Sequence, residues 1–239
     1  MTAPERKHNV SLRCVHCRKP LKNKTRDHVF PRSWYPRTTP AKVQRWTVPS
    51  CRKCNEEFGQ MEKELSIRLA LCVGPVKAEA AGLSRAAVES LGIGVSGLSP
   101  AEKRHRQALK SRILKDVHPY KPGTECLPGL GPHAGFREDQ QFEIGIPEKL
   151  LTEVAGKIVR GCEYVLAHKR IVEAPYTVKI HFADAAKIQD VLKIFDHFGP
   201  IQLGPGFEVR RAAAHEDPNL VMYKIDVWAT LTIYGTITD

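Results

Sequence analysis

The chain has 239 residues and a formal net charge of +11, and 42% of its residues are hydrophobic. That length is enough for one sizeable core, or for a small module joined to a larger domain. No apolar run is long enough for a membrane span, and residues 1–14 contain no apolar stretch typical of a signal peptide. We therefore expect a cytoplasmic protein with no membrane partner.

The positive charge is concentrated in the first part of the chain. Residues 1–75 carry 16 Lys and Arg against 6 Asp and Glu, whereas residues 121–239 carry 13 against 16. Lys and Arg contacts to phosphate groups release counterions, so a concentrated basic excess favours a polyanionic partner, either DNA or RNA. A basic face that only keeps the protein soluble would have the same composition, and the charge leaves both explanations open.

Two cysteine pairs predict a compact module over residues 1–72. Cys14 and Cys17 form one Cys-x-x-Cys pair, and Cys51 and Cys54 form another, with 33 residues between the pairs. Four thiolates at two such turns are the ligand set of a closed tetrahedral zinc site. A redox role is the alternative for a Cys-x-x-Cys pair, but the βαβ unit that accompanies redox motifs is missing from the pattern. We expect structural Zn²⁺ that staples a module too small to bury a large core.

A helix and a connector follow the second cysteine pair. Apolar residues with helical spacing continue from Cys54 until Gly74-Pro75 interrupts the pattern. Residues 73–145 are predicted to form a helical and irregular connector. Within it, the segment SPAE (Ser99 to Glu102) is a capping box that opens a basic helix. This helix could contact a nucleic-acid backbone or could be a solvated face, and the residues predicted to make phosphate contacts are Lys103, Arg106 and Lys110.

Residues 146–239 predict a C-terminal α+β domain of unknown role. The segment from Ile146 to Arg170 is a strongly amphipathic helix, and YTVKIHFA alternates as a strand. A second helix is predicted over AAKIQDVLKIFDHF, and the last 33 residues contain antiparallel strands. The fold class predicted for the whole chain is therefore α+β. Its oligomeric state is open, with a homodimer as one possibility.

The segment TRDHVFPRSW, between the cysteine pairs, carries the candidate chemistry. The carboxylate of Asp27 is a hard ligand suited to Mg²⁺ or Mn²⁺, and the imidazole of His28 can remove a proton from water. Neighbouring side chains of a strand point to opposite faces, but a twist or bend at the strand's end, encouraged by Pro31, could bring both toward one cleft. Asn55 follows Cys54 in the first turn of the predicted helix, where zinc would fix its position.

The same residues also permit an interpretation in which they have no catalytic role. His28 would then be a capped surface residue, and Asp27 would be the ion-pair partner of Arg26 or Arg32. The residues alone leave both interpretations open.

The arrangement CVHC…TRDHVFP…VPSCRKCN resembles the HNH nuclease family over about residues 12–65. The resemblance implies a ββα-metal fold and a metal-dependent endonuclease that hydrolyses phosphodiester bonds in DNA. It implies that His28 is the general base, and that Asp27 and Asn55 bind a catalytic divalent ion, Mg²⁺ or Mn²⁺. The implied structural zinc ligands are Cys14, Cys17, Cys51 and Cys54, and the arginines expected to hold flanking phosphates are Arg26, Arg32 and Arg45.

Two positions depart from the family pattern. Trp46 stands where the central Asn of the family is expected, and Gly59 stands where some members carry His or Lys. These departures keep a second function open, a zinc-stapled nucleic-acid-binding protein whose nuclease site is degenerate. A redox or zinc-storage protein is a third reading of the four cysteines.

Overall fold

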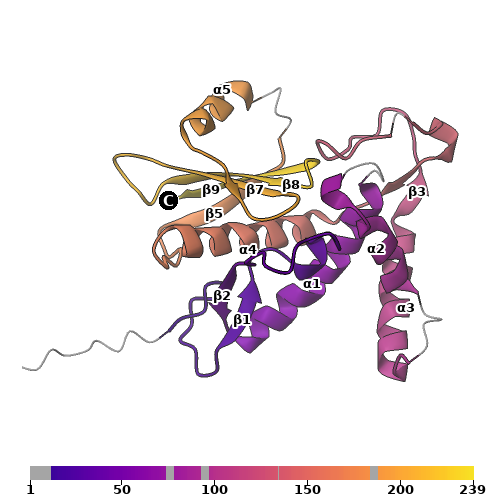
Figure 1. Cartoon of the computed structure of the whole chain (residues 1–239), viewed down its shortest axis with the longest axis horizontal. Coiled ribbons are helices and arrows are strands. Elements are labelled where there is room, and N and C mark those ends of the chain that lie inside the picture. The colour runs from indigo at the N-terminus through magenta and orange to yellow at the C-terminus, as the bar shows by residue number, and fades with distance from the viewer. Residues whose placement is uncertain (1–11, 74–77, 93–96, 134, 184–187) are drawn as a thin grey trace, which may run out of the picture.

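The structure is a computed structural model, and it describes residues 12–73, 78–92, 97–133, 135–183 and 188–239. Residues 1–11, on which the expectation about a signal peptide partly rests, lie outside these ranges. The chain is an α+β protein, as the sequence predicts (Figure 1). Within the described ranges, no helix has both the length and the apolar composition to cross a membrane.

Two strands and a long helix form the N-terminal part of the fold. Strand β1 (Thr25–His28) pairs antiparallel with β2 (Thr47–Ser50), and α1 (Arg52–Cys72) follows β2 directly. The sulfur of Cys51 caps α1 by accepting a hydrogen bond from the backbone N–H of Cys54 at 3.4 Å. The order of elements is therefore ββα, and the second cysteine pair lies at the point where strand changes to helix.

The connector is more ordered than the sequence suggests. Its helix α3 begins with the predicted capping box, in which the side chain of Ser99 and the side chain of Glu102 each bond the other residue's backbone. Two short antiparallel strands, which the sequence did not predict, close the segment rich in Pro and Gly into a loop. The elements of the connector are α2 (Leu83–Leu91), α3 (Pro100–Lys115), β3 (Val117–Pro119) and β4 (Phe142–Ile144). Short 3-10 helices lie at Arg32–Trp34, Ala78–Ala80 and Glu138–Gln140.

The C-terminal part is an antiparallel sheet with one long helix on its inner face. The strand order is β5-β9-β8-β7-β6, and the last predicted run of strand residues forms the hairpin β8–β9. The elements are α4 (Glu148–Leu166), β5 (Thr177–His181), α5 (Gln189–Leu192), β6 (Ile201–Gln202), β7 (Phe207–Ala213), β8 (Val221–Val227) and β9 (Leu231–Thr238).

The second helix predicted for this part covers residues 185–198; residues 185–187 lie outside the described ranges, and the described remainder is only partly α-helical. Helix α5 has four residues and continues as a 3-10 helix over Lys193–His197, on the opposite face of the sheet from α4 (Figure 1). The reason is visible in the burial, because Phe195 is buried whereas Val191 and Ile194 are exposed. A segment that buries little apolar surface gains little from tertiary packing, which is what usually stabilises a helix of this length.

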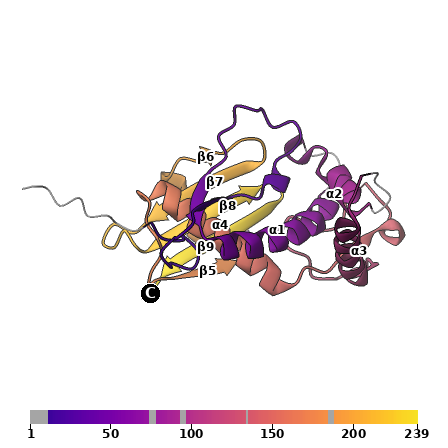
Figure 2. The same cartoon turned by 90° about the horizontal axis from the view of Figure 1, so that it is seen from below.

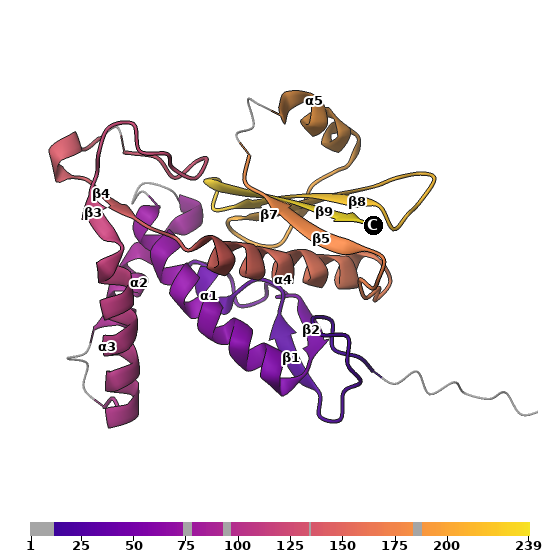
Figure 3. The ribbon, with the colours of Figure 1, turned by 180° about the vertical axis from the view of Figure 1, so that it is seen from behind.

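Helix α4 is the layer between the N-terminal ββα unit and the sheet (Figures 1 and 3). Figure 2 shows α1 and α4 crossing over the same face of the sheet. Two glycines allow the close packing of α4. A Cβ atom at Gly161 would lie 2.9 Å from the methyl carbons of Val29, and one at Gly235 in β9 would lie 2.5 Å from Val159 Cγ2.

One hydrophobic core runs through all three predicted segments. A single cluster of buried residues extends from Val15 to Ile237, and it includes Leu109 of α3. The segment between β1 and β2 packs directly on the sheet, where Trp34 and Trp228 have ring centroids 5.5 Å apart and Trp228 Nε1 donates to Trp34 O at 2.7 Å. The first predicted boundary coincides with the end of α1, and the core continues across it.

Two helical glycines make a matched test of this packing. We expect Gly161→Ala to lower the free energy of unfolding by about 1–3 kcal/mol, because the added methyl overpacks the contact with Val29. Gly59→Ala in α1, where a Cβ would meet nothing within 4 Å, should raise it by about 0.4–1 kcal/mol. Urea unfolding of both variants measures the difference. Equal effects of the two substitutions would contradict the packing of α4 against the N-terminal unit.

Candidate functional site

The four paired cysteines come together at the N-terminal end of α1. Their sulfur atoms all lie within 4.8 Å of one another, and Cys17 Sγ is 3.8 Å from Cys51 Sγ. Cys14 and Cys54 are buried, and the backbone N–H of Arg18 closes the first turn on Cys14 O at 2.8 Å. In the part of the chain that the structure describes, this is the one group of His, Cys, Asp and Glu side chains placed to share a metal ion.

The pKa values of Cys14 and Cys54 bear on whether the cluster can bind a metal ion as thiolates. Burial alone would raise the pKa of Cys14, but backbone N–H groups, first those of Cys17 and Cys51, lower it to about 7. Burial and the neighbouring thiols raise the pKa of Cys54. The four sulfurs therefore resist becoming four thiolates together unless a cation balances their charge. Four soft ligands at this spacing fit a closed tetrahedral zinc site.

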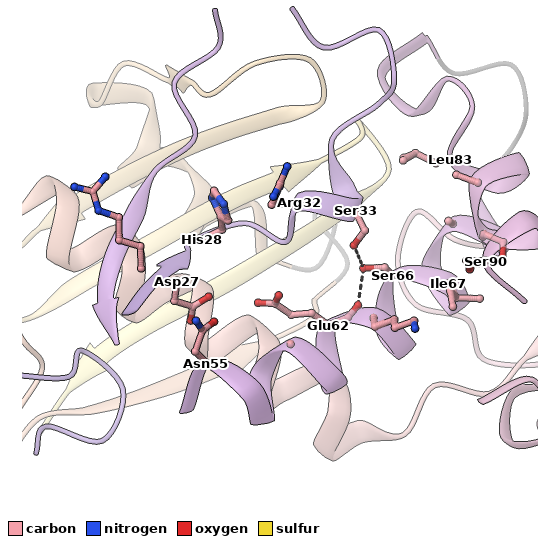
Figure 4. A pocket seen from close by; sticks show the side chains of 16 residues that line it. Asp27, His28, Arg32, Ser33, Asn55, Glu62, Ser66, Ile67, Leu83 and Ser90 are labelled. Atoms are coloured by element: carbon pink, nitrogen blue, oxygen red, sulfur yellow. Dashed lines mark hydrogen bonds between the residues drawn. The ribbon is translucent and has the colours of Figure 1, made fainter. Parts of the chain in front are cut away.

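A cavity of about 430 Å³ opens beside the end of β1, between α1 and α2. All three residues predicted to be catalytic line it: Asp27 and His28 from β1, and Asn55 from the first turn of α1 (Figure 4). Volumes of a few hundred Å³ are typical of ligand sites. The side chains that line the cavity also include Arg26, Arg32, Ser33, Glu62, Lys63 and Ser66.

The two neighbours in β1 reach the cavity from different sides. Asp27 points toward Asn55 and the start of α1, whereas His28 points the other way, toward Arg32 (Figure 4). The alternation of a strand is thus kept, and the cavity spans both sides of the strand end. The chain bends at Val29 and Phe30, directly after β1 and next to Pro31.

Both carboxylate oxygens of Asp27 already have partners. Oδ2 lies 2.9 Å from Nε2 of His16, and Oδ1 lies 3.1 Å from Nζ of Lys157, a residue of α4. Asp27 is only 4% exposed. Burial alone would raise the pKa of Asp27, but the hydrogen bond from His16 and the charge of Lys157 hold it below the ordinary value. The partner of Asp27 is therefore Lys157, and neither Arg26 nor Arg32 takes that place.

Lys157 is the centre of a buried charge cluster. Its exposed fraction is 0%, and its Nζ contacts Glu62 of α1 and the backbone carbonyl of His28 in addition to Asp27. An ammonium group has three protons, and three acceptors surround this one. Figure 4 shows Glu62 extending from α1 toward Asp27. Burial raises the pKa of Glu62, against the opposing charge of Lys157.

His28 is half-buried, and its surroundings favour the neutral imidazole. Burial, followed by the charges of Arg32 and Lys157, lowers its pKa. The imidazole is therefore neutral at pH 7, which is the form that a general base needs. Its Nδ1 atom is buried and has no hydrogen-bond partner among the described residues. The main chain at this position is held by the contact of Lys157 Nζ with His28 O.

The predicted phosphate contacts fall into two groups. Arg26 and Arg32 are exposed and line the cavity. Arg45 lies outside the lining, stacked 4.9 Å from the ring centroid of Tyr35, and its charge still acts on His28. Lys63 of α1, which the sequence did not single out, lines the cavity and also a second hollow beside α3.

The basic residues of α3 differ in what they do. Lys103 and Lys110 are exposed and available to a partner. Arg106 instead donates to the carbonyl oxygens of Gly92 at 3.2 Å and Glu89 at 3.4 Å, at the C-terminal end of α2. Arg106 therefore binds the C-terminal end of α2, and its contact with a phosphate group stays a prediction.

The two departures from the family pattern have definite surroundings. Trp46 packs against the core, and its backbone carbonyl accepts the N–H of Val29 at 3.0 Å, next to His28. The main chain thus supports the strand end at this position. Gly59 lines the cavity without a side chain, one turn of α1 after Asn55.

Comparison of the chain with family models, curated proteins and solved structures gave no significant match. The meaning of the site therefore depends on its own residues and geometry.

Lys63 and three further residues of the site were not predicted from the sequence. His16 lies between Cys14 and Cys17, a segment whose predicted role was zinc binding by the two cysteines. Glu62 follows Asn55 by seven positions, which is two helical turns on one face. Lys157 lies three positions after Val154 on the apolar stripe of α4, and a lysine inside such a stripe is a signal that it needs a buried partner.

The cysteine cluster predicts a metal content. We expect the purified protein to contain one zinc ion per chain, and Cys51→Ser to lose most of it, because one of four ligands is removed. Cys72→Ser is the matched control, since Cys72 lies at the far end of α1 outside the cluster. Metal analysis together with the melting temperature, before and after a chelator, provides the measurement. Full zinc content in Cys51→Ser would exclude this cluster as the site.

Proposed function

We propose that the protein is an endonuclease of the HNH type that hydrolyses phosphodiester bonds in DNA. The observation that carries the proposal is the meeting of Asp27, His28 and Asn55 around one cavity, beside a cluster of four cysteines that fits structural zinc. These side chains come from a strand end and from the first turn of the following helix. The cysteine cluster holds those two points together.

The charges around the cavity suit a phosphodiester substrate. Arg26, Arg32 and Lys63 line it and are exposed. Cationic side chains that flank a reacting phosphate attract it from solution and stabilise the negative charge of the transition state. Three basic residues of the first part of the chain therefore lie where the candidate chemistry lies.

The proton transfer can be assigned to His28. Its neutral imidazole accepts a proton from a water molecule while the water oxygen forms a bond to phosphorus. The bond from phosphorus to the 3′-oxygen breaks, and that oxygen takes a proton from solvent. Arg32 lies on the same side of the cavity as His28 (Figure 4) and is placed to hold a phosphate oxygen.

A catalytic divalent ion does not fit the arrangement that the structure describes. Such an ion needs carboxylate oxygens at about 2.0–2.6 Å, and both oxygens of Asp27 are paired with His16 and Lys157. Dependence of cleavage on Mg²⁺ or Mn²⁺ stays a prediction, and the steps above use only groups of this chain.

The pairing of both carboxylate oxygens of Asp27 with His16 and Lys157 also favours a second candidate function. In this second function the protein binds nucleic acid through its basic residues without cutting it. Zinc would then stabilise a binding module, and the cavity would recognise a phosphate group or an extruded nucleotide. Trp46 and Gly59 at the two departing positions agree with this reading.

Cleavage of supercoiled plasmid separates the two functions. We expect the zinc-loaded protein with added Mg²⁺ or Mn²⁺ to nick plasmid, and His28→Ala to lower the rate by about 10²–10⁴-fold, because the general base is lost. His105→Ala, an exposed histidine of α3, is the control that should cleave normally. An intact plasmid with wild type and mutant alike, together with a gel shift by both, would favour the binding protein.

The arginines of the cavity predict a salt dependence. We expect Arg32→Ala to weaken binding of a short DNA duplex and to reduce the slope of log K against log salt by about 1, because one phosphate contact is lost. Arg137→Ala is a suitable control, since Arg137 is equally exposed and lies between β3 and β4. Fluorescence anisotropy at several salt concentrations measures both. An unchanged slope for Arg32→Ala would place the DNA elsewhere on the surface.

A further inference from the structure

The cation paired with the two carboxylates of the site is a side chain of this protein. Lys157 Nζ is 3.1 Å from Asp27 Oδ1, and it also contacts Glu62 Oε1 and His28 O. Its three donors and these three acceptors match in number. The ammonium group is enclosed on all sides, because Lys157 is fully buried.

A divalent ion and this ammonium group cannot both use Asp27. The second oxygen, Oδ2, is held by His16 at 2.9 Å, so an incoming ion would have to take Oδ1 from Lys157. An ion bound there would lie within about 4 Å of the ammonium, where repulsion between unshielded positive charges is strong. Each cation therefore excludes the other.

We propose that Lys157 and a divalent ion compete for the Asp27–Glu62 pair, and that the ammonium excludes the ion while α4 is packed as observed. The inference deepens the proposed function, because it makes the position of α4 the control on metal loading. Helix α4 belongs to the C-terminal part, whose sheet is thereby coupled to the site. Withdrawal of Lys157 opens a cation site formed by Asp27, Glu62 and the adjacent Asn55.

The packing of α4 explains why the ammonium does not leave by itself. Val159 lies against Gly235 of the sheet, and Val29 lies against Gly161. The helix is therefore fixed on both sides within one turn of Lys157. Lys157 also has no exposed surface through which its side chain could reach solvent.

Binding of Mn²⁺ tests the competition directly. Zinc-loaded wild type, Lys157→Met and the control Lys149→Met are titrated with Mn²⁺ and followed by electron paramagnetic resonance. Lys149 lies on the same helix and is exposed. We expect Lys157→Met to bind one Mn²⁺ at least about 100-fold more tightly than wild type or the control, since a buried positive charge has been removed. Equal affinities in all three proteins would overturn the proposal.

Two further measurements keep the test decisive in the case that Lys157→Met does not fold. Glu62→Gln added to Lys157→Met should abolish the gain in Mn²⁺ affinity, and Mn²⁺ should raise the melting temperature of Lys157→Met more than that of wild type. If Lys157→Met does not fold, the broadening of the Asp27 amide signal by Mn²⁺ in the NMR spectrum of wild type decides. Broadening at low Mn²⁺ concentrations overturns the exclusion, and its absence supports it.

The outcomes separate this inference from the proposed function. Plasmid cleavage by wild type, together with Mn²⁺ affinities that do not respond to Lys157→Met, would sustain the nuclease and overturn the competition. The expected Mn²⁺ pattern in a protein that never cuts DNA would sustain the competition and overturn the nuclease.

Discussion

A buried lysine is the constraint on which the arrangement of this protein depends. Removal of an ammonium group from water is costly unless acceptors replace the lost hydration, and Lys157 obtains acceptors from β1 and from α1. Loss of one partner of such a buried pair typically costs about 3–5 kcal/mol. Helix α4 packs against the ββα unit in the register that brings Lys157 to Asp27 and Glu62. The same contact couples the C-terminal sheet to the candidate site.

The candidate site has two supports of different kinds. At one end, the cysteine cluster ties the turn at Cys14 to the start of α1, which fixes Asn55 relative to β1. At the other end, the carbonyl of Trp46 and the ammonium of Lys157 hold the main chain on both sides of His28. Positioning by the cysteine cluster is local to the N-terminal unit, whereas positioning by Lys157 depends on α4 of the C-terminal part.

Local sequence patterns predicted the elements whose stability is local. The capping box of α3, the helix after Cys54 and the hairpin at the C-terminus all have signals within a few residues, and the structure contains each of them. Helix α5 is short because its predicted apolar face finds little to pack against, and no local pattern reports that. The strands β3 and β4 were missed because their pairing brings together residues about 25 positions apart.

The sequence by itself determined the chemistry available to this protein: four thiols at zinc-binding spacing, and an acid, a base and an amide beside them. The spacing of Cys-x-x-Cys pairs and the position of Asn55 after Cys54 are properties of the sequence, so they do not depend on how the helices and strands pack. Only the tertiary structure decided which partners these side chains have. Asp27 gains its buried partner from Lys157, which lies 130 positions away, and Arg106 is diverted to the end of α2. Long-range contacts of this kind depend on how helices pack, and a linear pattern does not encode which side chains will meet.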